Sequence, residues 1–290
     1  MPLPIVGFDT SAHNRIKDDG AVAERVIASI GAKRDLRIFG MSVDELASTP
    51  DPTERAALFA SCKQLLQAGQ SRCLYGQNEL LQAHIRAHYD NPWIYDWRMV
   101  DSVSWEYDDE IRNCTLVSND ELSAEQRQQQ KELQKRYKQN VFAPLRSKFD
   151  PIYAKHNATR PRTFREFVEQ DEDATLRTGL GKMLYDCVTG LNISRYRIRE
   201  FMRICPPFRA FVFGMLMAEY DMSIADQRAG ERFKAQRNDL FMSIYLPYCD
   251  EFVTDEKEGE QARCLREIVK FAGLYTEVLS YEEFTKKLAA

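Results

Sequence analysis

Short apolar runs that stop at turn-forming residues mark both ends of the chain. They cover residues 4–8, 36–42, 72–75, 251–254 and 275–279. Runs of this length, with polar flanks, are typical of buried strands. Between these runs and at the end of the chain, apolar residues recur at the spacing of a helix. These segments are residues 21–31, 52–68, 239–248, 262–271 and from 281 onward. Because strands alternate with helices, the pattern predicts an α/β fold with a mostly parallel sheet.

The middle of the chain has a different, predominantly helical pattern. Two capping-box motifs precede a long polar stretch there, and residues 208–220 read as a buried helix. No internal repeat or low-complexity linker divides the chain. We therefore predict a discontinuous core made of residues 1–80 and 236–290, with a helical insertion at residues 81–235.

Composition and charge narrow the classes of protein that fit. With 44% hydrophobic and 29% charged residues, the chain suits a globular protein rather than a disordered one. Its net charge of −4 argues against a uniformly basic coat for nucleic acid. The longest apolar stretch is too short to span a bilayer, and the first residues lack the features of a signal peptide. Seven scattered cysteines without CxxC spacing are typical of a reducing compartment, so we predict a cytoplasmic protein with no membrane association.

Carboxylates occur at four places where a strand meets a loop or a helix. They lie in the segments Phe8-Asp9-Thr10, Val43-Asp44-Glu45, Asn238-Asp239-Leu240 and Thr254-Asp255-Glu256. Because ligand sites of parallel sheets gather at the carboxyl ends of the strands, we expect these acids to converge. Clustered carboxylates repel one another, so a hard cation such as Mg²⁺ or Mn²⁺ would stabilise them. Taken singly, each acid could instead be a helix cap or a solvated residue, and for Asp44 we favour that interpretation.

The segments IVGFDTS, SVDEL and NDLFMSIYLPYCDEFVTDEK together resemble the PIN-like nucleases. The resemblance covers residues 4–80 and 236–288, and it implies a PIN-like three-layer α/β fold with a central, mostly parallel sheet. That family places acids after its first strand, at the head of an early helix, at the start of a later helix, and after a strand ending in Thr or Ser. The chain departs from the family in two ways. The last acid usually lies two residues after the Thr, which would select Glu256 over Asp255, and compact members lack the long helical insertion.

The resemblance also implies an activity, that of a Mg²⁺- or Mn²⁺-dependent endoribonuclease that hydrolyses phosphodiester bonds. RNA is favoured over DNA by analogy with the family alone. The catalytic acids would be Asp9, Glu45, Asp239 and Asp255, and these four with Glu256 would be the metal ligands. Hydroxyls that hydrogen-bond the carboxylates would come from Thr10, Ser11 and Thr254.

Positive charge is concentrated in two parts of the predicted insertion. Residues 127–165 contain eleven Lys or Arg and two acids, and a second basic stretch has Tyr196 and Phe201 between its arginines. Such stretches can bind the phosphates and bases of single-stranded RNA. The candidate contacts are Lys131, Lys135, Arg136, Lys138, Arg195, Arg197 and Arg199. The alternative is a solvated helix face that pairs with the acidic residues of segment 101–125.

Other interpretations of the sequence remain open. The chain could be a non-catalytic PIN-like scaffold that binds RNA or a protein partner, or self-associates, through the helical insertion. It could also be an all-helical interaction protein whose resemblance is accidental. His84 and His88 are four residues apart and could share a metal, although ordinary packing is favoured because no third ligand accompanies them. His13, one turn beyond Asp9, could face the predicted cleft.

Overall fold

A central parallel sheet organises the structure, a computed structural model that describes residues 2–69, 71–113, 163–171, 174–224, 240–254 and 260–289. Five strands in these ranges form one sheet in the order β3-β2-β1-β4-β5, and every neighbouring pair is parallel. The strands are β1 (Ile5–Phe8), β2 (Asp35–Phe39), β3 (Arg72–Leu74), β4 (Glu251–Thr254) and β5 (Glu277–Ser280). The predicted α/β class and parallel sheet are confirmed, and the all-helical alternative is wrong.

The strand order reverses at β1, which lies in the middle of the sheet. On one side Val6 pairs with Leu36 of β2, and on the other Gly7 pairs with Phe252 of β4. The chain therefore builds outward through β2 and β3, and returns much later to place β4 against the opposite edge of β1. In open parallel sheets, ligands bind beyond the carboxyl ends of the strands at such a point of reversal.

Helices follow each strand and fill the part of the chain between β3 and β4. The first group is α1 (Thr10–Asp18), α2 (Gly20–Ser29), α3 (Gly40–Ala47), α4 (Pro52–Ala68), α5 (Gln77–Asp90), the 3₁₀ turn η1 (Trp97–Met99) and α6 (Trp105–Asn113). The second group is α9 (Phe164–Gln170), α10 (Thr175–Thr189), α11 (Arg195–Ile204), α12 (Pro206–Ile224), η3 (Met242–Tyr248), α14 (Glu260–Ala272) and α15 (Tyr281–Ala289). The α-helix predicted at 239–248 is mostly the 3₁₀ helix η3, which contains Pro247.

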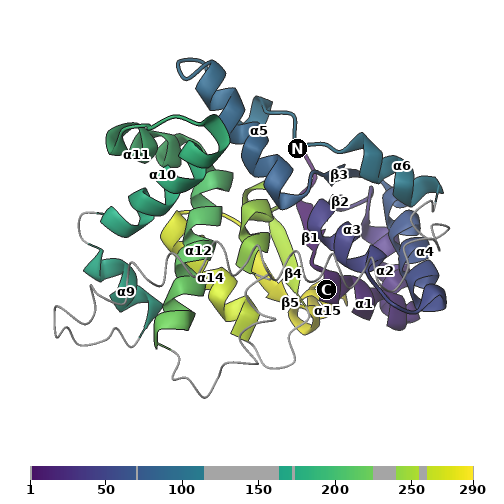
Figure 1. The fold of residues 1–290 in the computed structure, drawn as a ribbon. Coiled ribbons are helices and arrows are strands. Elements are labelled where there is room, and N and C mark those ends of the chain that lie inside the picture. The colour runs from purple at the N-terminus through teal and green to yellow at the C-terminus, as the bar shows by residue number, and fades with distance from the viewer. Residues whose placement is uncertain are drawn as a thin grey trace.

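Two hydrophobic cores, one on each face of the sheet, give the molecule three layers. Val253 and Leu279 pack with α1, α2, α4 and α15, whereas their neighbours Phe252 and Val278 pack with α12, α14 and η3. Adjacent strand residues point to opposite faces, so both faces carry apolar side chains and both must be covered. Figure 1 shows α2 and α4 to the right of the sheet and α12 and α14 to its left. The helical part thus shares one core with the left face of the sheet.

The core on that face leaves no room for a side chain at Gly7 of β1. A Cβ atom there would lie 2.1 Å from Cζ of Phe39, whose ring stacks on Tyr245 and Phe252 at centroid distances of 4.6 and 5.5 Å. Rings packed on both sides cannot shift without disturbing their neighbours. Tight packing of the central strand therefore depends on this glycine.

We expect Gly7→Ala to lower the free energy of unfolding by about 3 kcal/mol, because overpacking a close-packed core displaces neighbouring side chains. Urea denaturation at neutral pH measures this change. The matched control is Gly179→Ala in α10, where an added Cβ would meet nothing within 4 Å. That substitution should raise stability by up to about 1 kcal/mol, since alanine restricts the unfolded chain. Equal effects of the two substitutions would contradict the prediction.

In the part of the chain that the structure describes, no single helix is long and apolar enough to cross a bilayer. α11 and residues 206–220 of α12 pass that test only as a pair, and the two meet at an angle of 111°. Phe208 and Val212 of α12 are fully buried in the core.

Candidate functional site

Asp9 lies where the strand order reverses, at the carboxyl end of β1. Its side chain is only 4% exposed and caps the first turn of α1. One carboxylate oxygen accepts hydrogen bonds from the backbone N–H of Ala12 at 2.7 Å and from Oγ of Ser11 at 2.8 Å. The other accepts from Oγ1 of Thr254, the last residue of β4, at 2.5 Å. The carboxylate is therefore held rigidly between the ends of β1 and β4.

Glu45 approaches from the next strand end. α3 begins directly after β2, and Glu45 is half-buried in its second turn. One carboxylate oxygen of Glu45 accepts a hydrogen bond from Oγ1 of Thr10, the residue that follows Asp9. The hydroxyl of Thr10 thus links Glu45 to the residue next to Asp9. Hydrogen bonds and chain connectivity place Asp9, Thr10, Ser11, Glu45 and Thr254 at one edge of the sheet, whereas their roles in a metal site stay predictions.

Seven of the other predicted site residues lie outside the described part of the chain. They are Asp239, Asp255 and Glu256 of the acidic set, and Lys131, Lys135, Arg136 and Lys138 of the basic set. Their placement therefore stays a prediction.

Two further acids lie along the same edge of the sheet, and sequence reasoning did not select them. Asp44 accepts a hydrogen bond from the hydroxyl of Tyr107 at 2.9 Å, and Glu79 caps Gly76 in the first turn of α5. Desolvation raises the pKa of Asp44 to about 6, and the negative charge of Glu79 adds to this, while the Tyr107 hydrogen bond opposes it. The Asp44 side chain is exposed, so water reaching it limits the shift. Glu79 lies five residues after the end of β3, in the first turn of α5, so a search for acids in the first turn of the helix after a strand could have identified it.

The strand ends that carry these acids are in close contact. A Cβ atom on Gly40, at the start of α3, would lie 2.5 Å from the backbone nitrogen of Gly76. The buried hydroxyl of Tyr245 bridges the same two segments, because it accepts from the Met41 N–H and donates to the Tyr75 carbonyl. Burial raises the pKa of that hydroxyl, and the charges of Asp44, Glu79 and Glu45 raise it further. The Tyr245 hydroxyl therefore joins the segment at the start of α3 to the segment before α5.

The donor chemistry of the site fits a hard divalent cation. Within the described ranges, no group of three or more His, Cys, Asp or Glu side chains is placed to share a metal ion. Asp9 and Glu45 provide two carboxylates and only oxygen donors. Mg²⁺ is usually held in this way, by one or two protein carboxylates, several waters and the phosphates of a substrate. Asp9 and Glu45 can therefore supply the protein carboxylates that a Mg²⁺ site of this kind needs.

No family model matches the chain. No curated protein and no solved structure matches it either. Function therefore has to be inferred from the chemistry of the site itself.

Three histidines fall within the described residues, and their side chains are packed in the interior. His84 and His88 are buried and hydrogen-bond to tyrosine hydroxyls, His84 to Tyr95 and Tyr248, and His88 to Tyr185. Ordinary packing of this pair is thus confirmed. His13 is 1% exposed and packs against Phe8 and Cys62, so the expectation that it could face a cleft is wrong. The His13 side chain lies on the face of α1 that packs into the core, together with Ala12 and Ile16.

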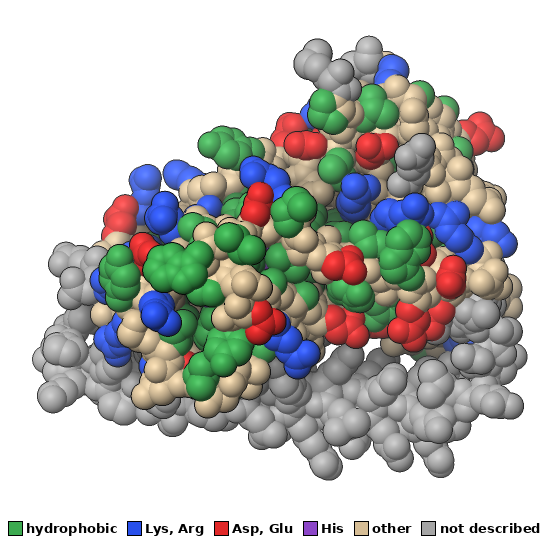
Figure 2. Space-filling model, turned by 90° about the horizontal axis from the view of Figure 1, so that it is seen from above, with side chains coloured by type: hydrophobic (Ala, Val, Ile, Leu, Met, Phe, Trp, Pro, Cys, Tyr) green, Lys and Arg blue, Asp and Glu red, His purple; other side chains and the backbone are tan. Residues whose placement is uncertain are grey.

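A basic surface lies on α11, at a distance from the carboxylates. Arg195, Arg197 and Arg199 are all exposed, and Tyr196 between them is 70% exposed. Seen from above, Lys and Arg side chains lie among hydrophobic ones over the left part of the molecule, where α10 and α11 lie (Figure 2). Exposed arginines interleaved with an aromatic ring suit the phosphates and bases of an unpaired strand.

Proposed function

We propose that this chain is a Mg²⁺- or Mn²⁺-dependent nuclease that hydrolyses RNA phosphodiester bonds, and that it is a divergent PIN-like protein. The observation that carries the proposal is the buried, hydrogen-bonded Asp9 at the reversal point of the parallel sheet, connected to Glu45 through Thr10. A buried carboxylate is costly unless hydrogen bonds or a cation compensate it. The preference for RNA over DNA rests on the family resemblance, and the basic face of α11 supports binding of a nucleic acid.

The residues of the chain divide into groups that hold the cation and groups that orient them. Asp9 and Glu45 would hold the cation, with Asp239 and either Asp255 or Glu256 as the further ligands that the resemblance implies. A divalent ion bound there lowers the pKa of water and neutralises charge on the phosphate.

Neighbouring groups fix the carboxylates. Ser11, Thr254 and the Ala12 N–H hold Asp9, and Thr10 holds Glu45. Supports of this kind commonly determine the affinity of a metal site.

The direct test is cleavage of a mixed pool of single-stranded RNA by the purified protein with Mn²⁺, with Mg²⁺ and with excess EDTA. We expect cleavage that requires the divalent ion, and Mn²⁺ binding detectable by calorimetry. A pool of single-stranded DNA of matched lengths shows whether RNA is preferred. Absence of cleavage together with absence of metal binding would overturn the proposal.

A second candidate function is a non-catalytic scaffold that binds a protein through the helical part. The observation that favours it is a concentration of exposed apolar side chains after α5. Trp93 is 95% exposed, Met99 83% and Ile94 79%, and Trp105 is 59% exposed at the start of α6. Exposed apolar side chains gathered in one region are a feature of interaction surfaces. This function replaces the nuclease if the protein neither binds Mn²⁺ nor cleaves RNA.

A further inference from the structure

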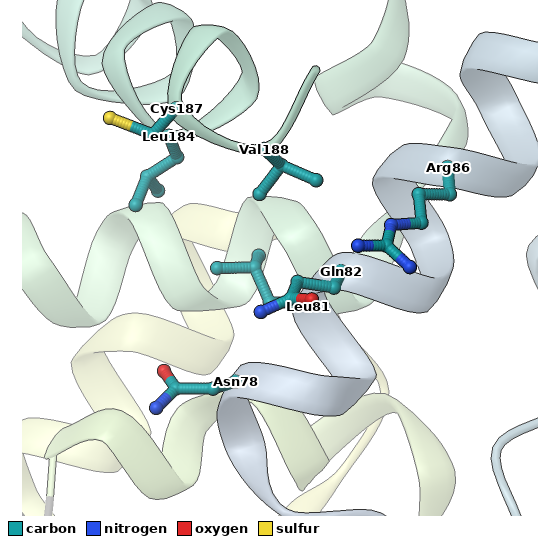
Figure 3. Close-up of a pocket in the computed structure, with 7 residues that line it drawn as sticks. All are labelled: Asn78, Leu81, Gln82, Arg86, Leu184, Cys187 and Val188. Atoms are coloured by element: carbon teal, nitrogen blue, oxygen red, sulfur yellow. The ribbon is translucent and has the colours of Figure 1, made fainter. Parts of the chain in front are cut away.

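A groove lies between α5 and α10, and it begins at the first turn of α5, which also carries Glu79. Its volume is about 430 Å³. The lining residues come from two helices only: Asn78, Leu81, Gln82 and Arg86 from α5, and Leu184, Cys187 and Val188 from α10. In Figure 3, Leu184 and Val188 face Leu81 and Gln82 across the groove, with Asn78 and Arg86 at its two ends. The groove falls within the size range of sites for small ligands and single nucleotides.

The groove leads away from the carboxylates. Asn78 is adjacent to Glu79 in the first turn of α5, where the helix leaves the carboxyl edge of the sheet. Asn78, Gln82 and Arg86 are spaced by four, so they share one face of the helix over about 12 Å. Figure 1 shows α5 between the sheet and the pair α10 and α11.

At its far end α5 meets the basic helix α11. His88, one turn from the end of α5, packs on Phe201 of α11 with ring centroids 4.3 Å apart. Arg197 of α11 is close enough that its charge helps to lower the pKa of His88, after the larger effect of burial. Carboxylates, groove and arginines therefore follow one another along α5.

The lining suits one unpaired nucleotide. Leu81, Leu184 and Val188 form apolar walls for the faces of a base, as in pockets that hold bases removed from a stack. The amides of Asn78 and Gln82 can each donate and accept hydrogen bonds at a base edge. Arg86 supplies a positive charge for a phosphate. An acidic peptide would use Arg86 alone and leave both amides without a charged partner.

We propose that the α5–α10 groove binds an unpaired nucleotide of the RNA strand that the carboxylate site would cleave, and that the strand continues toward the arginines of α11. The identity of the scissile strand rests on the proposed nuclease function, whereas binding in the groove can be measured without cleavage. The groove's volume of about 430 Å³ suits one nucleotide rather than a section of duplex.

Cys187 provides a direct probe of occupancy. Its thiol is exposed in the groove, whereas Cys62, Cys73, Cys205, Cys249 and Cys264 are buried. In a Cys114→Ser background, N-ethylmaleimide should alkylate Cys187 first, since reaction requires access to the thiolate. With EDTA present to prevent cleavage, short single-stranded RNA at about ten times its Kd should slow that alkylation about tenfold, because only free protein reacts. RNA duplex of the same sequence should protect weakly, and an unchanged rate with single strands would overturn the proposal.

Substitutions locate the bound strand independently. Arg86→Glu removes the phosphate contact and Val188→Trp fills the groove from a half-buried position on α10. Each should weaken binding of single-stranded RNA in EDTA by about tenfold, and Arg86→Glu should also reduce its salt dependence. The matched control is Arg25→Glu. Arg25 is exposed on α2, so this substitution makes the same change of charge away from the groove. Equal affinities in all four proteins would overturn the groove assignment.

The groove and the nuclease can fail separately. Metal-dependent cleavage with no protection of Cys187 would leave the nuclease in place and overturn the groove. Protection of Cys187 without any cleavage would support the groove and overturn the nuclease.

Discussion

Asp9→Asn is expected to reduce Mn²⁺-dependent RNA cleavage by about 100- to 1,000-fold, because a metal-held transition state loses several kcal/mol when a principal ligand loses its charge. The fold should survive the change. Asparagine caps a helix as well as aspartate does, so the Ala12 N–H keeps an acceptor. Initial cleavage rates and Mn²⁺ calorimetry of the same preparation measure both effects.

The matched control for that substitution is Asp19→Asn. Asp19 is also a helix cap, accepting from the Val22 N–H at 3.1 Å, but it is exposed and lies at the far end of α1. Cleavage and metal binding by this variant should equal those of the wild type. If both variants lost activity together with their thermal stability, the effect would be on folding and Asp9 would have no special role.

Acid should destabilise the wild type more than it destabilises His13→Leu. Burial lowers the pKa of His13 from 6.5 to about 4, since no water compensates the charged ring. Between about pH 6.5 and about pH 4, His13 is therefore protonated in the unfolded chain and neutral in the folded chain. The contribution of His13 to the free energy of unfolding is fully present above about pH 6.5 and is lost as the pH falls toward about 4.

Measured at about pH 4.5 rather than about pH 7.5, the free energy of unfolding should fall by about 2.5 kcal/mol more in the wild type than in His13→Leu. Urea denaturation of both proteins at both pH values gives this double difference. Other groups, such as Glu251 with its lowered pKa, titrate equally in the two proteins and cancel. His84, whose pKa burial also lowers to about 4, remains in both. Parallel pH profiles of the two proteins would contradict the prediction.

The strands were predictable because a strand buried on both faces is a short apolar run. The run at residues 251–254 matches β4, and helix 52–68 matches α4, which has Pro52 in its first turn. Helix α1 was missed. Its sequence, TSAHNRIKD, is mostly polar, and only Ala12, His13 and Ile16 are buried. That face forms because α1 packs on α4 and β1, which no local pattern reveals.

The candidate site was predictable only one strand end at a time. Asp9 and Glu45 could be chosen because each follows a predicted strand, but nothing near Thr10 shows that its hydroxyl reaches Glu45. Asp44 was set aside because an acid beside another acid usually points into solvent. Its contact with Tyr107 spans 63 residues and depends on how α6 folds back. Contacts at such separations follow from topology rather than from local sequence.

The position of β4 determines when the candidate site can exist during synthesis. Thr254 lies 245 residues after Asp9, and its hydroxyl completes the hydrogen bonds that hold the Asp9 carboxylate. Domains fold as units during translation, and a strand cannot pair before it has left the ribosome. A nascent chain that carries Asp9, Glu45 and all of α5 therefore still lacks the arrangement described here.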